Sequence, residues 1–179
     1  MKVLTHILSA TVLLASTTLG TRAQESLTLD KKVLSLAAAR KVIAAAEAEA
    51  ASRALGVVIV VVDDAGNVIQ LSRMDTAQVA SVSVGIGKAR TAAIYRRPSR
   101  DFEEQIRNGR VAALALADAT PLQGGVPIIV EGKVVGAVGV SGDSPQADEE
   151  IAMAGARVLE KIGSRSLVRT VKSRSPTEP

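Results

Sequence analysis

The side chains best suited to binding a ligand lie close together near the middle of the 179-residue chain. Lys88 and Thr91 are three residues apart and Tyr95 follows one turn later, so a helix would place them on one face. Arg73 and Asp75 precede that helix and are candidates for the same pocket. Cationic side chains hold carboxylates, and a tyrosine or threonine oxygen could approach a metal. The residues alone favour the alternative, in which the charges are solvated and the other two side chains pack.

Glycines form the second group of candidates. Gly124 and Gly125 lead from a tight bend into an apolar run, where they would permit a ligand to approach the backbone closely. A strained turn into an edge strand is an equally good interpretation. Gly136, Gly139 and Gly142 occur along and just after a later strand, and glycine inside a strand often indicates a bulky neighbour. That neighbour could be a flat ligand, although a packed helix is the commoner case.

Acidic side chains offer a weaker metal hypothesis. Asp101 and Glu104 are three apart on a predicted helix, and such paired carboxylates can take a hard cation or ferric ion. A solvated helix face is the more common role for this pattern. Asp148 opens the last predicted helix, where the backbone dipole favours an acidic residue. We therefore predict that Asp148 caps that helix.

The N-terminus predicts export. A basic start, an apolar run from Ile7 to Leu19 and the small-residue site around Ala23 are typical of a secretory signal peptide covering residues 1–23. The run is shorter than the roughly 20 residues that span a bilayer, so we expect no stable membrane anchor. The predicted location is periplasmic or secreted. Cleavage would remove His6, the only histidine, from a chain without cysteine, which excludes an ordinary zinc site or a Cys or His nucleophile.

The remaining chain has the length of one domain, predicted over residues 24–162. Lys and Arg number 22 against 18 acidic residues, and the basic excess gathers in residues 163–179, which are also rich in Ser and Pro. We predict that this tail is disordered and solvated. The chain has one Tyr, one Phe and no Trp, so the interleaved aromatic and basic residues of single-strand binders are absent, and we expect no nucleic-acid partner.

Hydrophobic patterning predicts an α+β fold. Residues 111–117 are ambiguous between helix and strand. The expected elements are a helix over Asp30–Leu55, hairpin strands over Val57–Val62 and Val68–Met74, helices over Ala80–Tyr95 and Asp101–Arg107, hairpin strands over Val126–Val130 and Lys133–Val140, and a helix over Asp148–Ile162. Asp30 is the predicted N-cap of the first helix, and Gly56 its stop.

Four motifs together give the chain a family resemblance over roughly residues 27–162. The motifs are Ser72–Asp75, Gly87–Ala93, Gly124–Ile128 and Val134–Gly142. They resemble the GlcG/HbpS haem-binding family, also labelled haem-degrading. The resemblance implies a profilin-like antiparallel sheet of about five strands packed by helices, and a homo-oligomer. It also implies iron at surface carboxylate pairs such as Asp101 and Glu104.

The resemblance favours the pocket interpretation of the polar candidates. It implies haem, or another flat anionic small molecule, bound by Arg73, Asp75, Lys88, Thr91, Tyr95, Gly124 and Gly125. The expected function is a secreted or periplasmic haem-binding protein, with haem degradation and iron sequestration both open as activities. Two alternatives stay open: a non-catalytic, sensor-like binding module, and an oligomeric stress protein whose pocket is vestigial. The residues identify no catalytic group, so enzymatic activity stays open as well.

Overall fold

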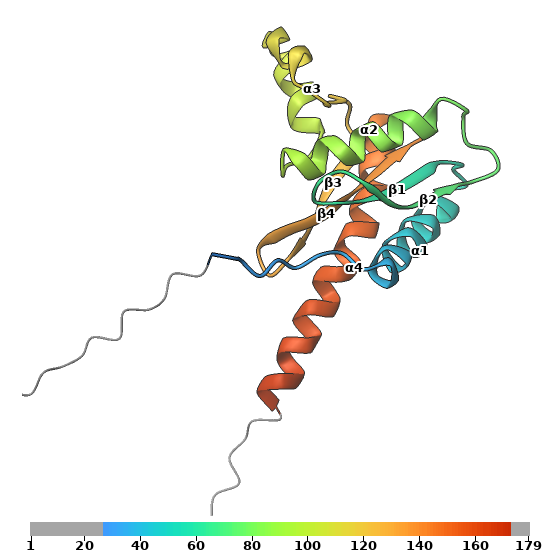
Figure 1. Ribbon diagram of the computed structural model, residues 1–179. Helices are drawn as coiled ribbons and strands as arrows, with labels where there is room; N and C mark the ends of the chain where they lie inside the picture. The colour runs from blue at the N-terminus through green and yellow to red at the C-terminus, as the bar shows by residue number, and fades with distance from the viewer. Residues whose placement is uncertain (1–26, 173–179) are drawn as a thin grey trace, which may run out of the picture. The chain divides into compact units, whose positions relative to one another are not determined.

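The computed structural model describes residues 27–172, with side chains through Glu160. The predicted signal peptide and residues 173–179 of the predicted tail lie outside this range. Within it, a four-stranded antiparallel sheet has the order β2-β1-β4-β3 (Figure 1). The α+β prediction is confirmed, but the sheet has four strands and not the expected five. The elements are α1 (Leu36–Ser52), β1 (Val58–Asp63), β2 (Val68–Arg73), α2 (Ser81–Ile94), α3 (Arg100–Arg107), the short 3-10 helix η1 (Val111–Ala115), β3 (Gly125–Val130), β4 (Lys133–Ser141) and α4 (Pro145–Lys172).

Strand β1 is buried on both faces because helices cover both sides of the sheet. Ile59 and Val61 join the core formed with α1 and α4, while Val58 and Val60 join the core formed with α2. Figure 1 shows α2 on one side of the sheet and α1 with α4 on the other. A strand buried on both faces is expected to read as a continuous β-branched run, which is the pattern that predicted it.

Two helix starts differ from prediction for the same physical reason. Helix α1 begins at Leu36, because the side chain of Ser35, and not that of Asp30, accepts a hydrogen bond from the Ala38 backbone N–H at 3.1 Å. It ends at Ser52, before Gly56. Helix α4 begins at Pro145, and Ser144 caps it by accepting from the Ala147 N–H.

The structure also decides where the last helix ends and which element residues 111–117 form. The helix continues through Lys172, beyond the Ile162 end that we predicted. The ambiguous segment contains η1, so it forms a 3-10 helix and not a strand.

The strand glycines allow a helix to approach the sheet. A Cβ on Gly139 would stand 2.3 Å from the carbonyl oxygen of Gly85 and 2.5 Å from the amide nitrogen of Ala89, both in α2. Distances this short cannot accommodate a side chain. The neighbour that leaves no room for a side chain at Gly139 is therefore the packed helix α2, and not a flat ligand.

Candidate functional site

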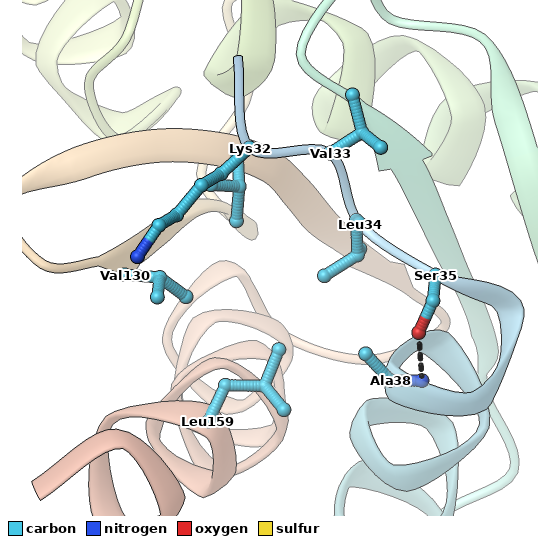
Figure 2. Close-up of a pocket in the computed structure, with 8 residues that line it drawn as sticks. Lys32, Val33, Leu34, Ser35, Ala38, Val130 and Leu159 are labelled. Atoms are coloured by element: carbon cyan, nitrogen blue, oxygen red, sulfur yellow. Dashed lines mark hydrogen bonds between the residues drawn. The ribbon is translucent and has the colours of Figure 1, made fainter. Parts of the chain in front are cut away.

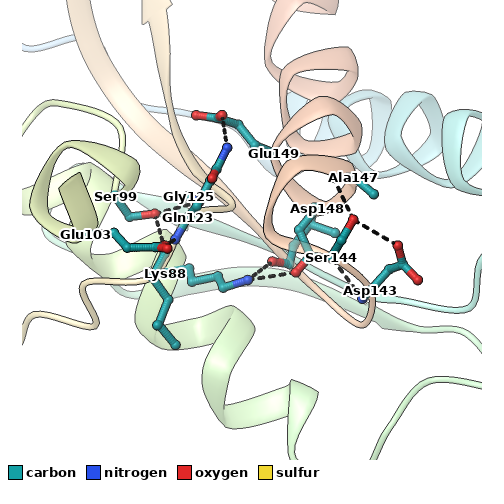
Figure 3. A network of polar contacts seen from close by, with 12 residues as sticks. Lys88, Ser99, Glu103, Gln123, Gly125, Asp143, Ser144, Ala147, Asp148 and Glu149 are labelled. Atoms are coloured by element: carbon teal, nitrogen blue, oxygen red, sulfur yellow. Dashed lines mark hydrogen bonds and ion pairs between the residues drawn. The ribbon is translucent and has the colours of Figure 1, made fainter. Parts of the chain in front are cut away.

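Lys88 and Asp148 form an ion pair inside the protein. The Lys88 Nζ lies 2.7 Å from the Asp148 Oδ2 and also donates to the carbonyl oxygen of Val140 at 3.0 Å (Figure 3). The two side chains are only 5% and 2% exposed. The pair joins α2 to α4 across the end of β4, so the positive charge of Lys88 is neutralised from within the chain.

Asp148 does not act as the N-cap of α4, contrary to prediction, because Ser144 occupies that position. Burial raises the pKa of the Asp148 carboxyl group, although Lys88 and the backbone N–H groups of Asp143 and Gly142 act in the opposite direction. The Asp143 N–H donates to Oδ1 at 3.1 Å. The direction of the shift shows that these partners only partly offset the loss of water around the carboxylate.

Gly124 and Gly125 are next to this ion pair. Gly124 has φ +125°, and a Cβ there would stand 2.9 Å from the Lys88 Nζ and 2.7 Å from the Val140 carbonyl oxygen. A Cβ on Gly125 would stand 2.1 Å from the Lys88 carbonyl oxygen. The structure therefore brings Lys88, Gly124 and Gly125 together, as the site prediction required. The space between them is occupied by protein atoms.

A second polar network fixes the loop before β3. The Glu149 Oε2 accepts from the Gln123 Nε2 at 2.7 Å and from the Arg100 Nη1 at 2.9 Å. The Ser99 Oγ accepts from the Gly125 N–H at 2.8 Å (Figure 3). Together these bonds tie the start of α3 to β3 and α4, which sets the position of the segment that joins α2 to α3.

Thr91 and Tyr95 have internal hydrogen bonds. Thr91 is fully buried; its hydroxyl donates to the Gly87 carbonyl at 2.7 Å and accepts from the Thr120 N–H at 2.7 Å. The Tyr95 hydroxyl donates to the carbonyl oxygen of Ala117 at 2.7 Å. Both oxygens hold the loop that follows η1 against the C-terminal part of α2, so each would have to lose a bond to approach a metal.

Arg73 and Asp75 are exposed at the opposite edge of the sheet from Gly125. β1 and β4 separate the edge strands, a span of about 14 Å at ordinary strand spacing. The Arg73 Nη2 has only a long contact, 3.5 Å, to the Ala77 carbonyl. The structure thus places Arg73 at the predicted end of the sheet but gives it no contact with Lys88. The ligand role of these residues stays a prediction.

The proposed metal residues lie on the exposed side of α3. Glu104 has Arg100 as its partner, with Nε and Oε1 3.6 Å apart. Among the residues that the structure describes, no group of three or more His, Cys, Asp or Glu side chains could surround a metal ion. Iron at Asp101 and Glu104 stays a prediction. Within the same residues, no helix combines the length and apolar character needed to cross a bilayer.

Two clefts on the described part of the chain bear on ligand binding. The larger, about 330 Å³, is lined mainly by apolar side chains of the segment before α1, of the β3–β4 hairpin and of α4 (Figure 2). We call it the N-terminal cleft; its lining residues are Lys32, Val33, Leu34, Ser35, Ala38, Val130, Val135 and Leu159. Its cation, Lys32, is paired with Glu131. This cleft therefore has little to offer an anionic ligand.

The second cleft, about 290 Å³, has a different chemical character, and we call it the arginine cleft. It is lined by Arg96, Arg97, Pro98, Val126, Pro127, Ile129, Met153, Ala156, Arg157 and Glu160. The α2–α3 connection, edge strand β3 and α4 each supply part of it. Its lining combines apolar side chains with three arginines and one glutamate. An apolar floor with a few polar groups is typical of ligand sites.

None of the three arginines of this cleft has an ion pair within the described part of the chain, whereas Arg53, Arg100 and Arg107 all do. The sequence analysis missed these three residues. The adjacent arginines before Pro98 were a usable signal, and so was the i, i+4 spacing of Met153 and Arg157 on the last helix. The strand residues that join them from another part of the chain carry no local signal.

The structure is thus that of a small α+β protein with a cleft whose lining combines apolar side chains and arginines. A family model described as "Haem degrading protein HbpS-like" matches residues 34–157. The chain belongs to this HbpS-like family, and the predicted resemblance is confirmed.

Related proteins agree with this assignment. The protein GlcG of Escherichia coli K12 is 43% identical over 111 residues, which are 62% of this chain and 83% of GlcG. The crystal structure of the Klebsiella pneumoniae protein ORFY is 29% identical, has a TM-score of 0.72, and the match covers 77% of this chain and 98% of that one. A double mutant of Streptomyces reticuli HbpS is 30% identical with a TM-score of 0.69, over 78% and 96% of the two chains.

Proposed function

We propose that this protein binds haem, and that haem lies in the arginine cleft. The observation that carries the proposal is the combination of an apolar floor with three arginines that have no carboxylate partner within the described residues. Haem has the matching chemistry, because its flat apolar body carries propionate groups at one edge. The HbpS-like family assignment, with its description as haem-degrading, supports the same ligand.

The side chains present fit such a ligand. The Met153 thioether is a soft donor, and methionine is an established axial ligand of haem iron. Glu160 offers a carboxylate oxygen as an alternative. The volume of about 290 Å³ lies at the small end of the range for ligand pockets, so we expect haem to stay partly exposed. Bound haem would supply iron and its redox chemistry, while the chain supplies binding and orientation.

The test is titration of the recombinant protein with haemin, followed through the Soret band. A shifted band that saturates near one haem per chain supports the proposal, and a featureless rise without saturation contradicts it. Arg157→Gln should weaken binding by about tenfold, the effect of losing a hydrogen bond to a charged group. A matched control is Arg40→Gln on the exposed surface of α1, outside both clefts.

We further propose export, self-association and a fate for the haem. Removal of residues 1–23 would place the protein in the periplasm or outside the cell, and an intact mass beginning near Gln24 tests this. Exposed Val111 and Leu114 on η1 are suitable contacts for a homo-oligomer. Light scattering should then give at least a dimer.

Loss of the Soret band with peroxide or a reductant would indicate degradation of the haem, and a stable band would favour iron storage.

A further inference from the structure

Arg97 lies against one of the chain's two aromatic side chains. Its guanidinium carbon lies 4.2 Å from the centroid of the Phe102 ring. Phe102 is fully buried, and its ring meets Tyr95 edge-on, with centroids 5.0 Å apart and an interplanar angle of 63°. The protein has one Phe, one Tyr and no Trp. Phe102 therefore contacts Arg97 directly, and Tyr95 packs against the edge of Phe102.

A contact between a guanidinium group and a ring face does not use the hydrogen-bond donors of the cation. A cation held against a ring face uses the face of its plane, whereas its N–H donors point outward within the plane. The Arg97 Nε is buried and has no hydrogen-bond partner among the described residues. A buried donor without a partner is costly to the folded state. The position of Arg97 is thus maintained without any internal acceptor for that donor.

Neighbouring Arg100 shows that the chain can satisfy an arginine in this region. Its guanidinium donates to Glu149 at 2.9 Å and lies 3.6 Å from Glu104. No carboxylate of the described residues reaches Arg97 in the same way, although Arg97 lines a cleft with an apolar floor. The unpartnered Nε of Arg97 is therefore not the result of a general shortage of acceptors in this region.

We propose that Arg97 is the carboxylate anchor of the arginine cleft. Its in-plane N–H donors take one carboxylate of the ligand, and the apolar body of the ligand lies against Val126, Pro127 and Ile129. For haem the carboxylate is a propionate, so this inference rests on the proposed function. Arg96 and Arg157 add positive charge at the rim. Arg97 is distinct from them because an aromatic stack fixes its orientation before the ligand arrives.

The experiment compares haemin with haemin dimethyl ester, which has the same macrocycle and iron but no carboxylate. We expect esterification to weaken binding to the wild-type protein by about tenfold or more, the loss expected for a charge-assisted hydrogen bond. Arg97→Gln should weaken haemin binding to a similar degree. In Arg97→Gln the penalty for esterification should be clearly smaller than in the wild type, because the contact between Arg97 and one carboxylate is already lost.

Two further variants separate charge from geometry. Arg97→Lys keeps a positive charge but loses the planar fork, so we expect it to resemble Arg97→Gln. Arg40→Gln removes an exposed arginine outside the cleft and should bind haemin within about twofold of wild type, as a distant surface change does. If Arg97→Gln fails to fold, the acid and ester comparison in Arg97→Lys takes its place.

The outcomes are distinguishable. A wild-type protein that binds no haemin at a defined stoichiometry would overturn both the proposed function and the role of Arg97. A wild-type protein that binds haemin while Arg97→Gln binds it equally well would overturn only the role of Arg97. An ester penalty of the same size in wild type and variant would also contradict the anchor, because the carboxylates would then be contacting another residue.

Discussion

Two cations of this protein occupy opposite chemical settings. Lys88 is buried and satisfied by Asp148 and the Val140 carbonyl. Arg97 borders an open cleft, stacked on Phe102, with a buried donor that has no partner among the described residues. Both would look like anion-binding groups in a sequence. The comparison shows which kind of cation points to a ligand site. It is one that the protein holds in a fixed orientation but does not pair with a carboxylate.

The largest expected effect comes from breaking the buried pair. Lys88→Met leaves Asp148 as an uncompensated buried charge, and we expect a loss of about 3–5 kcal/mol in the free energy of unfolding, measured by chemical denaturation. The double variant Lys88→Met/Asp148→Leu should recover most of this loss, because apolar replacements of both partners remove the charge itself. A stable Lys88→Met protein that has lost only haem binding would reverse the roles we assign to the two cations.

A second prediction tests the close packing beside that pair. Gly125→Ala would place a Cβ 2.1 Å from the Lys88 carbonyl oxygen, so backbone must move, and we expect about 1–3 kcal/mol of destabilisation. The matched control is Gly132→Ala in the β3–β4 turn, where no atom lies within 4 Å of the added Cβ. That control has φ +74° and should cost only about 1 kcal/mol, the cost of a left-handed backbone. Equal stability of the two variants would contradict the tight packing.

The third prediction concerns the rim of the arginine cleft. Arg96 has φ +55° immediately after α2, a conformation that glycine adopts freely. Arg96→Gly should therefore be more stable to denaturation than Arg96→Ala by about 1 kcal/mol. Both variants lose the same charge, so both should bind haemin more weakly than wild type and to the same extent. If instead the more stable of the two variants also bound haemin more tightly, Arg96 would be acting through its backbone conformation and not through its charge.

The smallest effect is on pH dependence. Because burial raises the pKa of Asp148 in the folded state, the folded protein binds its proton more tightly than the unfolded chain does. The contribution of Asp148 to stability is thus fully present below the ordinary aspartate pKa of about 3.9 and decreases as pH rises through the folded pKa. Relative to Asp148→Asn, the wild-type free energy of unfolding should fall over that range. A rise would mean that Lys88 outweighs burial.

Local patterns were enough to predict most elements of this fold. The β-branched run predicted β1, the spacing of small and apolar residues predicted α2, and both hairpins followed from their turns. The first residues of α1 and α4 were wrong, because Ser35 and Ser144 provide the capping oxygens. A cap depends on local backbone geometry, and several nearby Ser and Asp residues could have supplied it.

The sites depend on contacts between distant parts of the chain. Lys88 and Asp148 are 60 residues apart in the sequence. The sequence therefore could not show that these two side chains form an ion pair and neutralise each other. The arginine cleft combines three segments, and only the folded chain brings Met153 next to Arg97 and Pro127. Spacing along one helix correctly grouped Lys88 with Thr91, but it could not show that both point into the interior.

The central position of β1 has a consequence for how the molecule opens. Its backbone is paired to β2 on one side and β4 on the other, and side chains cover both of its faces. Amide protons of this strand should exchange with deuterium only when the whole domain unfolds. The connection that carries Arg97 lies beside an edge strand, where smaller fluctuations suffice for exchange. Ligand entry could then proceed through local motion while the centre of the sheet stays closed.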